Sequence, residues 1–192
     1  MGVGQPTAGY LQSMRLLTGV READQRLTRQ APSRIPPGLG QMLSAVEEAT
    51  AGTKLWCGAA AMTAFGGWRG RTAAAAGLAA LAVAQLASNA VCKQLTDRPR
   101  PPNDWIPHEE AEDRPDPSSF PSGHTAAAVA FTAAVAPTWP LAGALCAVPT
   151  AMVAIERVQS GAHYPSDVAA GAVIGLASAW LTRRLPPRLR RH

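Results

Sequence analysis

The chain has 192 residues, of which 47% are hydrophobic, 5% aromatic and 16% charged, and its formal net charge is +5. This length suits one folded domain. The charged fraction lies below the roughly 25% that is typical of soluble domains, and this composition excludes a disordered or fibrous protein. The basic balance is compatible with nucleic acid, a membrane surface or an anionic substrate, so the positions of the cations decide among them.

Residues 1–50 are polar and mixed. The stretch 21–27 predicts a short amphipathic helix that ends at Pro32, Pro36 and Pro37, and 38–48 could begin another. We interpret residues 1–50 as an amphipathic N-terminal region. It either lies on a membrane surface or a partner helix, or forms a solvated cap on the main body.

About five runs without charged residues follow: 55–68, 72–92, two within 125–155 that Pro137 and Pro140 separate, and 168–182. The second run is long enough to cross a bilayer core at about 1.5 Å per helical residue. Several runs are shorter than about 17 residues, so a soluble Ala-rich bundle is an alternative. Because five such runs are hard to place in one small soluble core, we predict an all-α fold. It would be an integral membrane bundle of about five transmembrane helices over residues 51–185.

Three further features complete this organisation. Gly171 and Gly175 in the last run form a small-xxx-small pair that favours close helix packing. Residues 101–120 form a polar loop rich in proline and acid, of the kind that often serves as a lid or binding loop. The basic tail, 186–192, together with Arg69 and Arg71, predicts a cytoplasmic side for those helix ends, although the arginines of residues 1–50 favour the opposite.

Ionisable residues stand at the ends of the apolar runs. They follow the second run, open the third, and lie between the fourth and the fifth: Lys93, Arg100, His124, Arg157, His163 and Asp167. In an up-and-down order of five spans, all of these fall on one side of the membrane. Three cations and two histidines on one face predict an anion site with acid–base groups.

Local features favour a phosphate as the anion. Ser122 is a good N-cap before a helical run, Gly123 permits close approach of the backbone, and the first N–H groups of a helix attract oxyanions. Lys93 and Arg100 could clamp phosphate oxygens. Two histidines and an aspartate could instead ligate zinc, but the surrounding cations oppose a metal, and such a site needs none.

His163 and Asp167 are four residues apart. If they begin a helix they share one face, so the carboxylate would hold one imidazole nitrogen. The other nitrogen would then attack phosphorus.

These residues together resemble a known family. Lys93-x6-Arg100-Pro101, Pro121-Ser122-Gly123-His124 and Arg157-x5-His163-x3-Asp167 are similar to the three signature motifs of the type-2 phosphatidic acid phosphatase (lipid phosphate phosphatase) superfamily. The family includes bacterial undecaprenyl pyrophosphate phosphatases, which the short chain and the amphipathic N-terminal region resemble most, and also soluble acid phosphatases and vanadium haloperoxidases. Glu156 departs from the pattern, in which serine usually precedes the arginine.

The resemblance implies a role for each motif residue. His163 would be the nucleophile that forms a phosphohistidine, Asp167 would orient it, and His124 would protonate the leaving oxygen and then activate water. The phosphoryl oxygens would be held by the remaining motif residues: Lys93, Arg100, Ser122, Gly123 and Arg157. No cofactor or metal is implied.

We therefore predict a multi-pass cell-membrane phosphatase whose active site faces outside. It would hydrolyse the phosphate monoester or diphosphate of a lipid: a polyprenyl pyrophosphate or phosphate, phosphatidic acid or phosphatidylglycerol phosphate. Its partners would be that substrate and membrane lipids, and not nucleic acid, because the arginines cluster at span ends and in the tail with no aromatic platform between them. The alternatives are a soluble acid phosphatase or haloperoxidase-like enzyme on the same site, and a non-catalytic lipid-binding scaffold.

Overall fold

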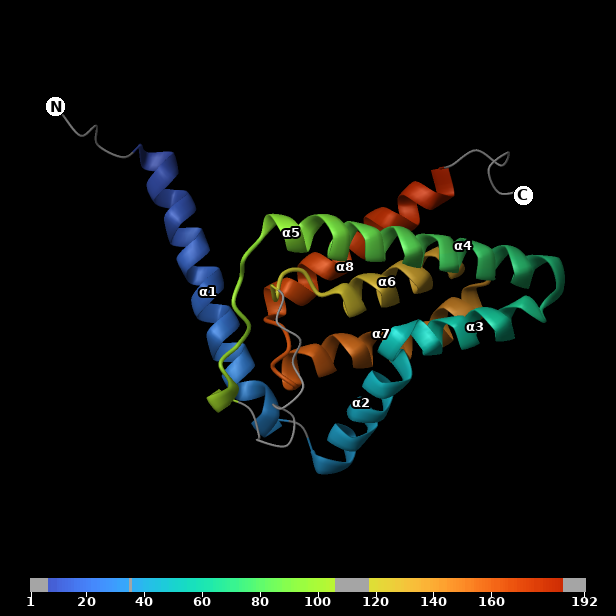
Figure 1. Cartoon of the computed structure of the whole chain (residues 1–192), viewed down its shortest axis with the longest axis horizontal. Coiled ribbons are helices and arrows are strands. Elements are labelled where there is room, and N and C mark those ends of the chain that lie inside the picture. The colour runs from blue at the N-terminus through green and yellow to red at the C-terminus, as the bar shows by residue number, and fades with distance from the viewer. Residues whose placement is uncertain (1–6, 35, 106–117, 185–192) are drawn as a thin grey trace.

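The computed structural model describes residues 7–34, 36–105 and 118–184, and for a few of them, Lys93 included, the backbone alone. Most of the predicted 101–120 loop and the whole basic tail lie outside the described residues. The described chain is helical and has no strand (Figure 1), which confirms the predicted all-α class. Its elements are α1 (Ala8–Arg34), α2 (Pro37–Thr50), η1 (Ala51–Thr53), α3 (Lys54–Ala64), α4 (Gly67–Gln85), η2 (Leu86–Cys92), α5 (Lys93–Leu95), η3 (Asn103–Trp105), α6 (Gly123–Val135), α7 (Pro140–Gln159) and α8 (Pro165–Arg184).

Helix α6 is the centre of the bundle and packs against α4, α7 and α8 (Figure 1). Most of its buried side chains are alanines, which let the neighbouring helices approach closely. Phe131 supplies the bulk that alanine lacks, and its ring lies 5.5 Å from the ring of Trp56 on α3. Gly77 of α4 makes room for it, since a Cβ there would come within 2.8 Å of the Phe131 ring.

The contact between α6 and α8 depends on the two glycines that the sequence singled out. A Cβ on Gly171 would lie 2.4 Å from the carbonyl oxygen of Ser122, and one on Gly175 would lie 2.6 Å from that of Ala126. No side chain fits in so short a gap. The predicted small-residue contact is therefore confirmed, and it brings the start of α8 against the start of α6.

Two of the described helical stretches are long and apolar enough to cross a membrane, Gly67–Ala90 and Pro140–Gln159. By length and composition, fewer of the described helices are clearly apolar spans than the five that the sequence predicts. Helix α3 has 11 residues, and α6 has 13 residues and is apolar. Helix α6 is enclosed by other helices, and a charge-free run in the sequence does not distinguish such a helix from one at the surface of the bundle.

The N-terminal region forms a longer helix than the sequence indicated. Helix α1 spans 27 residues and includes Pro32 in its last turn, where the proline costs one backbone hydrogen bond and the helix ends two residues later. Its large hydrophobic side chains, such as Leu16 and Leu17, are exposed. Among its described side chains only Asp24 and Thr28 are buried, and both are polar.

Candidate active site

The three motifs meet at one end of the bundle, where α5 ends, α6 begins and the turn between α7 and α8 lies (Figure 1). Helix α4 reaches this end through the π-helical turn η2. Such turns are frequent at functional sites because they shift the register of the residues that follow. Here the residue that follows is Lys93, whose backbone begins α5.

The second motif forms the N-terminus of α6. Ser122 is the N-cap, and its Oγ accepts a hydrogen bond of 3.4 Å from the backbone N–H of Thr125. Its own N–H donates to the carbonyl oxygen of Asp167 at 3.0 Å, which ties the second motif to the third. Gly123 lies against Asn89 of η2, where a Cβ would come within 2.8 Å of the amide oxygen. The predicted capping role of Ser122 is present, and the structure adds a close contact between Gly123 and Asn89.

His163 lies in the turn before α8, not inside it, because the helix begins only at Pro165. Its side chain is 3% exposed, and its Nδ1 lies 2.5 Å from the carbonyl oxygen of Ser119. Since a carbonyl oxygen only accepts, the neutral imidazole carries its proton on Nδ1 and its lone pair on Nε2. This is the tautomer that a nucleophilic histidine requires. From the sequence we expected the carboxylate of Asp167 to hold the ring. No pattern in the sequence indicated Ser119.

Two motif arginines flank this histidine. Arg100 donates from Nη1 to the carbonyl oxygen of Ala162 at 2.7 Å. Arg157 is buried, and its backbone carbonyl accepts the N–H of His163 at 2.9 Å. The first and third motifs therefore lie together, as predicted, at the turn that carries His163.

Arg157 is shared between two carboxylates, Glu156 and Glu47. Glu156 is the residue that departs from the family pattern, and Glu47 lies on α2, far from the motifs in sequence. Burial raises the pKa of the Glu47 carboxyl, but the charge and hydrogen bond of Arg157 outweigh it and lower the pKa below its ordinary value. The charge of His124 lowers it further, so Glu47 is close to both predicted site residues. No sequence signal pointed to Glu47.

Asp167 is fully buried, in the first turn of α8. Its Oδ2 accepts the backbone N–H of Tyr164 at 2.9 Å, and its Oδ1 contacts Nη1 of Arg98. The Arg98 guanidinium lies over the Tyr164 ring, 4.4 Å from its centre, and burial raises the pKa of that phenol. Arg98 falls within the spacing of the first motif, yet the sequence assigned it no role.

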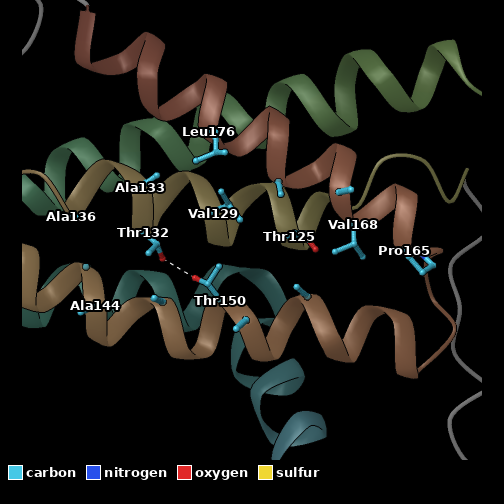
Figure 2. A pocket seen from close by; sticks show the side chains of 16 residues that line it. Thr125, Val129, Thr132, Ala133, Ala136, Ala144, Thr150, Pro165, Val168 and Leu176 are labelled. Atoms are coloured by element: carbon cyan, nitrogen blue, oxygen red, sulfur yellow. Dashed lines mark hydrogen bonds between the residues drawn. The ribbon is translucent and has the colours of Figure 1, made fainter. Parts of the chain in front are cut away.

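An apolar groove of about 640 Å³ runs between α6, α7 and α8 (Figure 2). It starts beside the site, at Thr125 and Val168, the residues that follow His124 and Asp167, and continues to Ala136 at the far end of α6. Half of the residues that line it are alanines. One hydrogen bond of 2.7 Å, between the hydroxyls of Thr132 and Thr150, crosses from α6 to α7.

The helical bundle and the basic, histidine-containing cluster at its end define a class of protein that binds anions. Residues 73–191 match the sequence model of the PAP2 superfamily, which is more than half of the chain, so the protein belongs to this superfamily. The fold is similar to the crystal structure of a transmembrane PAP2-type phosphatidylglycerolphosphate phosphatase from Bacillus subtilis, with a TM-score of 0.66 and 22% identity over 90% of this chain and 89% of that one. Together with the two long apolar helices, this fold indicates an integral membrane protein.

Shorter stretches are similar to curated proteins. A lipid A 1-phosphatase of Rhizobium johnstonii is 46% identical over 67 residues, 33% of this chain and 25% of that protein. The bacitracin transport permease protein BcrC of Bacillus licheniformis is 39% identical over 72 residues, 38% of this chain and 36% of that protein. The chain thus covers only a quarter to about a third of the length of these relatives.

Proposed function

We propose that the protein hydrolyses the phosphate monoester or diphosphate of a membrane lipid through a phosphohistidine intermediate. The observation that carries this proposal is His163, whose Nδ1 faces the Ser119 carbonyl, so that its Nε2 holds the lone pair, in a turn that the Arg100 side chain and the Arg157 backbone both contact. Cations near a histidine nucleophile stabilise the spread negative charge that dominates phosphoryl transfer.

The steps assign a role to each motif residue. Nε2 of His163 attacks phosphorus, the bond to the leaving oxygen breaks, and His124 donates its proton to that oxygen. His124 then takes a proton from a water molecule, whose oxygen attacks the phosphohistidine and releases phosphate and the neutral imidazole. The cationic motif residues and the α6 N-terminus around Ser122 and Gly123 would hold the phosphoryl oxygens, and Asp167 would stabilise the charge on the His163 ring. Positive charge for the transition state comes from these side chains, so the scheme requires no metal.

The groove beside the site supports a lipid as the substrate. From Thr125 to Ala136 it follows α6 for roughly 16 Å at about 1.5 Å per residue, which accommodates an extended apolar chain. A phosphate group at the motif end of the groove would place its chain among Ala and Val side chains. A polyprenyl phosphate or pyrophosphate, phosphatidic acid and phosphatidylglycerol phosphate all carry such a chain.

We further propose that the active site faces the outside of the cell membrane. Helix α4 starts near Arg69 and Arg71 and leads toward the motifs, whereas α8 starts at the motifs and ends at Arg183 and Arg184. Both basic pairs are therefore at the end of the bundle away from the site. Basic residues favour the cytoplasmic side, so this arrangement supports an external site.

The test is phosphate release by the detergent-purified protein in EDTA, with His163→Ala as the control. The substrates are undecaprenyl pyrophosphate, a polyprenyl monophosphate, phosphatidic acid, phosphatidylglycerol phosphate and soluble p-nitrophenyl phosphate. Release that persists in EDTA and is lost in the variant is expected. Loss of release in EDTA would contradict the metal-free scheme, and equal release by wild type and variant would contradict the assignment of the nucleophile.

A further inference from the structure

Helix α1 contributes a carboxylate to the catalytic end of the bundle. The side chain of Asp24 is 3% exposed, although the helix that carries it is otherwise mostly exposed. Its Oδ1 accepts the backbone N–H of Ser166 at 2.9 Å, and its Oδ2 accepts the Ser166 hydroxyl at 2.6 Å and Nη2 of Arg98 at 2.7 Å. A buried carboxylate is costly unless it is paired and hydrogen-bonded, and Asp24 is both.

Apolar packing does not explain why α1 docks here. Its buried described side chains are Asp24 and Thr28, and a hollow of about 680 Å³ lies beside the Asp24–Arg98 contact, lined by residues of α1 and of the first-motif loop. The polar cluster around Asp24 is thus one attachment of α1 at this end. A second attachment of α1 is the guanidinium of Arg29, which lies over the Trp105 ring, 4.1 Å from its centre.

Arg98 connects Asp24 to the proposed nucleophile by two routes. Its guanidinium bridges Asp24 and Asp167 with separate nitrogens, a geometry that the planar fork of arginine suits. Its backbone carbonyl accepts the N–H of Ser119 at 2.8 Å, and the carbonyl of Ser119 in turn holds Nδ1 of His163. A shift of Arg98 would therefore disturb both the carboxylate of Asp167 and the orientation of the imidazole.

From these contacts we propose that Asp24 is a positioning residue of the catalytic centre, acting through Arg98 and Ser166 on Asp167 and His163. Helix α1 then belongs to the catalytic unit, although it lies before residue 73, where the family match begins. Asp24 holds Arg98 between two carboxylates and fixes the first turn of α8 through Ser166. This inference rests on the proposed function, because the effect of Asp24 is read in the rate of phosphate release.

The test compares kcat and KM for phosphate release in full-length Asp24→Asn and Asp24→Ala with those of wild type. Asp24→Asn keeps the shape and one acceptor oxygen for Ser166 but removes the charge that holds Arg98. The matched control is Glu22→Gln, an exposed carboxylate on the same helix. We expect Asp24→Ala to lower kcat by about 10- to 100-fold, as small misplacements of reacting groups do, with KM within about twofold and no change in Glu22→Gln.

A double-mutant cycle separates positioning from a loss of fold. If Asp24 acts through Arg98, then Asp24→Asn combined with Arg98→Gln is no slower than Arg98→Gln alone. Additive losses would overturn the inference, as would a wild-type kcat in Asp24→Ala. If the loss of kcat in Asp24→Ala disappears when the assay temperature is well below the unfolding midpoint of that variant, the role of Asp24 is structural. That result would also overturn the inference. Wild-type release no higher than that of His163→Ala would instead remove the proposed function, and the inference with it.

Discussion

At the scale of single residues, the most unusual feature of the site is the pair of carboxylates on Arg157. A phosphate that binds this arginine must compete with Glu47, whose side chain is 43% exposed and belongs to a helix outside the motifs. Glu156 is buried beside it. The arginine is therefore held in place before substrate arrives, and the exposed partner is the one that a phosphate can displace.

Replacement of Glu47 with glutamine is expected to lower KM for a phosphate substrate. The amide keeps the size of the side chain but removes the negative charge that competes for Arg157. Exposed ion pairs contribute at most ~1 kcal/mol, so the decrease in KM is at most about fivefold. Steady-state kinetics test this, with Glu48→Gln, an exposed neighbour on α2, as the control. A higher KM in Glu47→Gln would mean that Glu47 assists binding.

The same residue predicts a pH dependence of stability. Because Arg157 lowers the pKa of Glu47 in the folded protein, the folded state binds this proton less readily than the unfolded state. The resulting stabilisation is complete above the ordinary value of 4.5 and is lost as the pH falls through the lower, folded value. Thermal unfolding measured from pH 7 down to pH 3 should show that Glu47→Gln loses less stability with falling pH than wild type does. Identical curves would contradict the prediction.

At the scale of elements, the catalytic end is formed by close contact of helices that lack large side chains. Gly171 and Gly175 bring α8 against α6, and this contact sets the distance between Ser122 and the first turn of α8. The geometry of the proposed phosphate site thus depends on two glycines, which have no side chain that could take part in the reaction.

Gly175→Ala tests this dependence. Its Cβ would lie 2.6 Å from the carbonyl oxygen of Ala126 and 2.9 Å from the backbone N of Ala130, so the two helices must separate. We expect a loss of about 1–3 kcal/mol of stability and a lower rate of phosphate release. In the control, Gly58→Ala on α3, the new Cβ meets nothing within 4 Å. That variant should be unchanged or slightly more stable, because alanine favours helix by up to ~1 kcal/mol. Equal unfolding midpoints in detergent for the two variants would contradict the contact.

The groove makes a second prediction at this scale. Ala147 of α7 lines the groove, whereas the next residue, Val148, is exposed and does not. Ala147→Phe should raise KM for a long-chain lipid phosphate about tenfold, the effect of displacing roughly two methylenes at ~0.8 kcal/mol each. It should leave p-nitrophenyl phosphate unaffected, and Val148→Phe should affect neither substrate. The same KM increase for the soluble substrate would show that the groove does not hold the chain.

At the scale of the whole molecule, the opposite ends of the bundle carry different groups. The motifs lie at one end, and the basic pairs that start α4 and finish α8 lie at the other. If the protein sits in the membrane as proposed, exposed residues at the two ends are reached from different sides.

Single-cysteine variants measure this orientation. In a background with Cys57, Cys92 and Cys146 replaced, Asp97→Cys near the site should react with a membrane-impermeant thiol reagent in intact cells. Arg184→Cys at the other end should react only after the membrane is opened. The reverse pattern would place the active site inside.

The sequence by itself determined the helical class, the motif residues and the small-residue contact of α8, because each is encoded in local spacing or in an uninterrupted apolar run. In an up-and-down arrangement of the helices, the positions of the motifs along the chain place Arg100, Ser122 and His163 at one end of the bundle. The surroundings of each apolar helix did not follow in the same way. A charge-free run such as that of α6 reads alike whether lipid or protein surrounds it.

Only the tertiary structure decided which residues outside the motifs join the site. Asp24, Glu47 and Ser119 reach it from α1, α2 and the segment before α6, and each is an ordinary polar residue in its own stretch of sequence. Their roles arise from long-range contacts between helices, and no local pattern of charge or hydrophobicity specifies those contacts. The hydrogen bond from His163 to a backbone carbonyl is the clearest case, because every residue has a carbonyl and only the fold selects which one faces the ring.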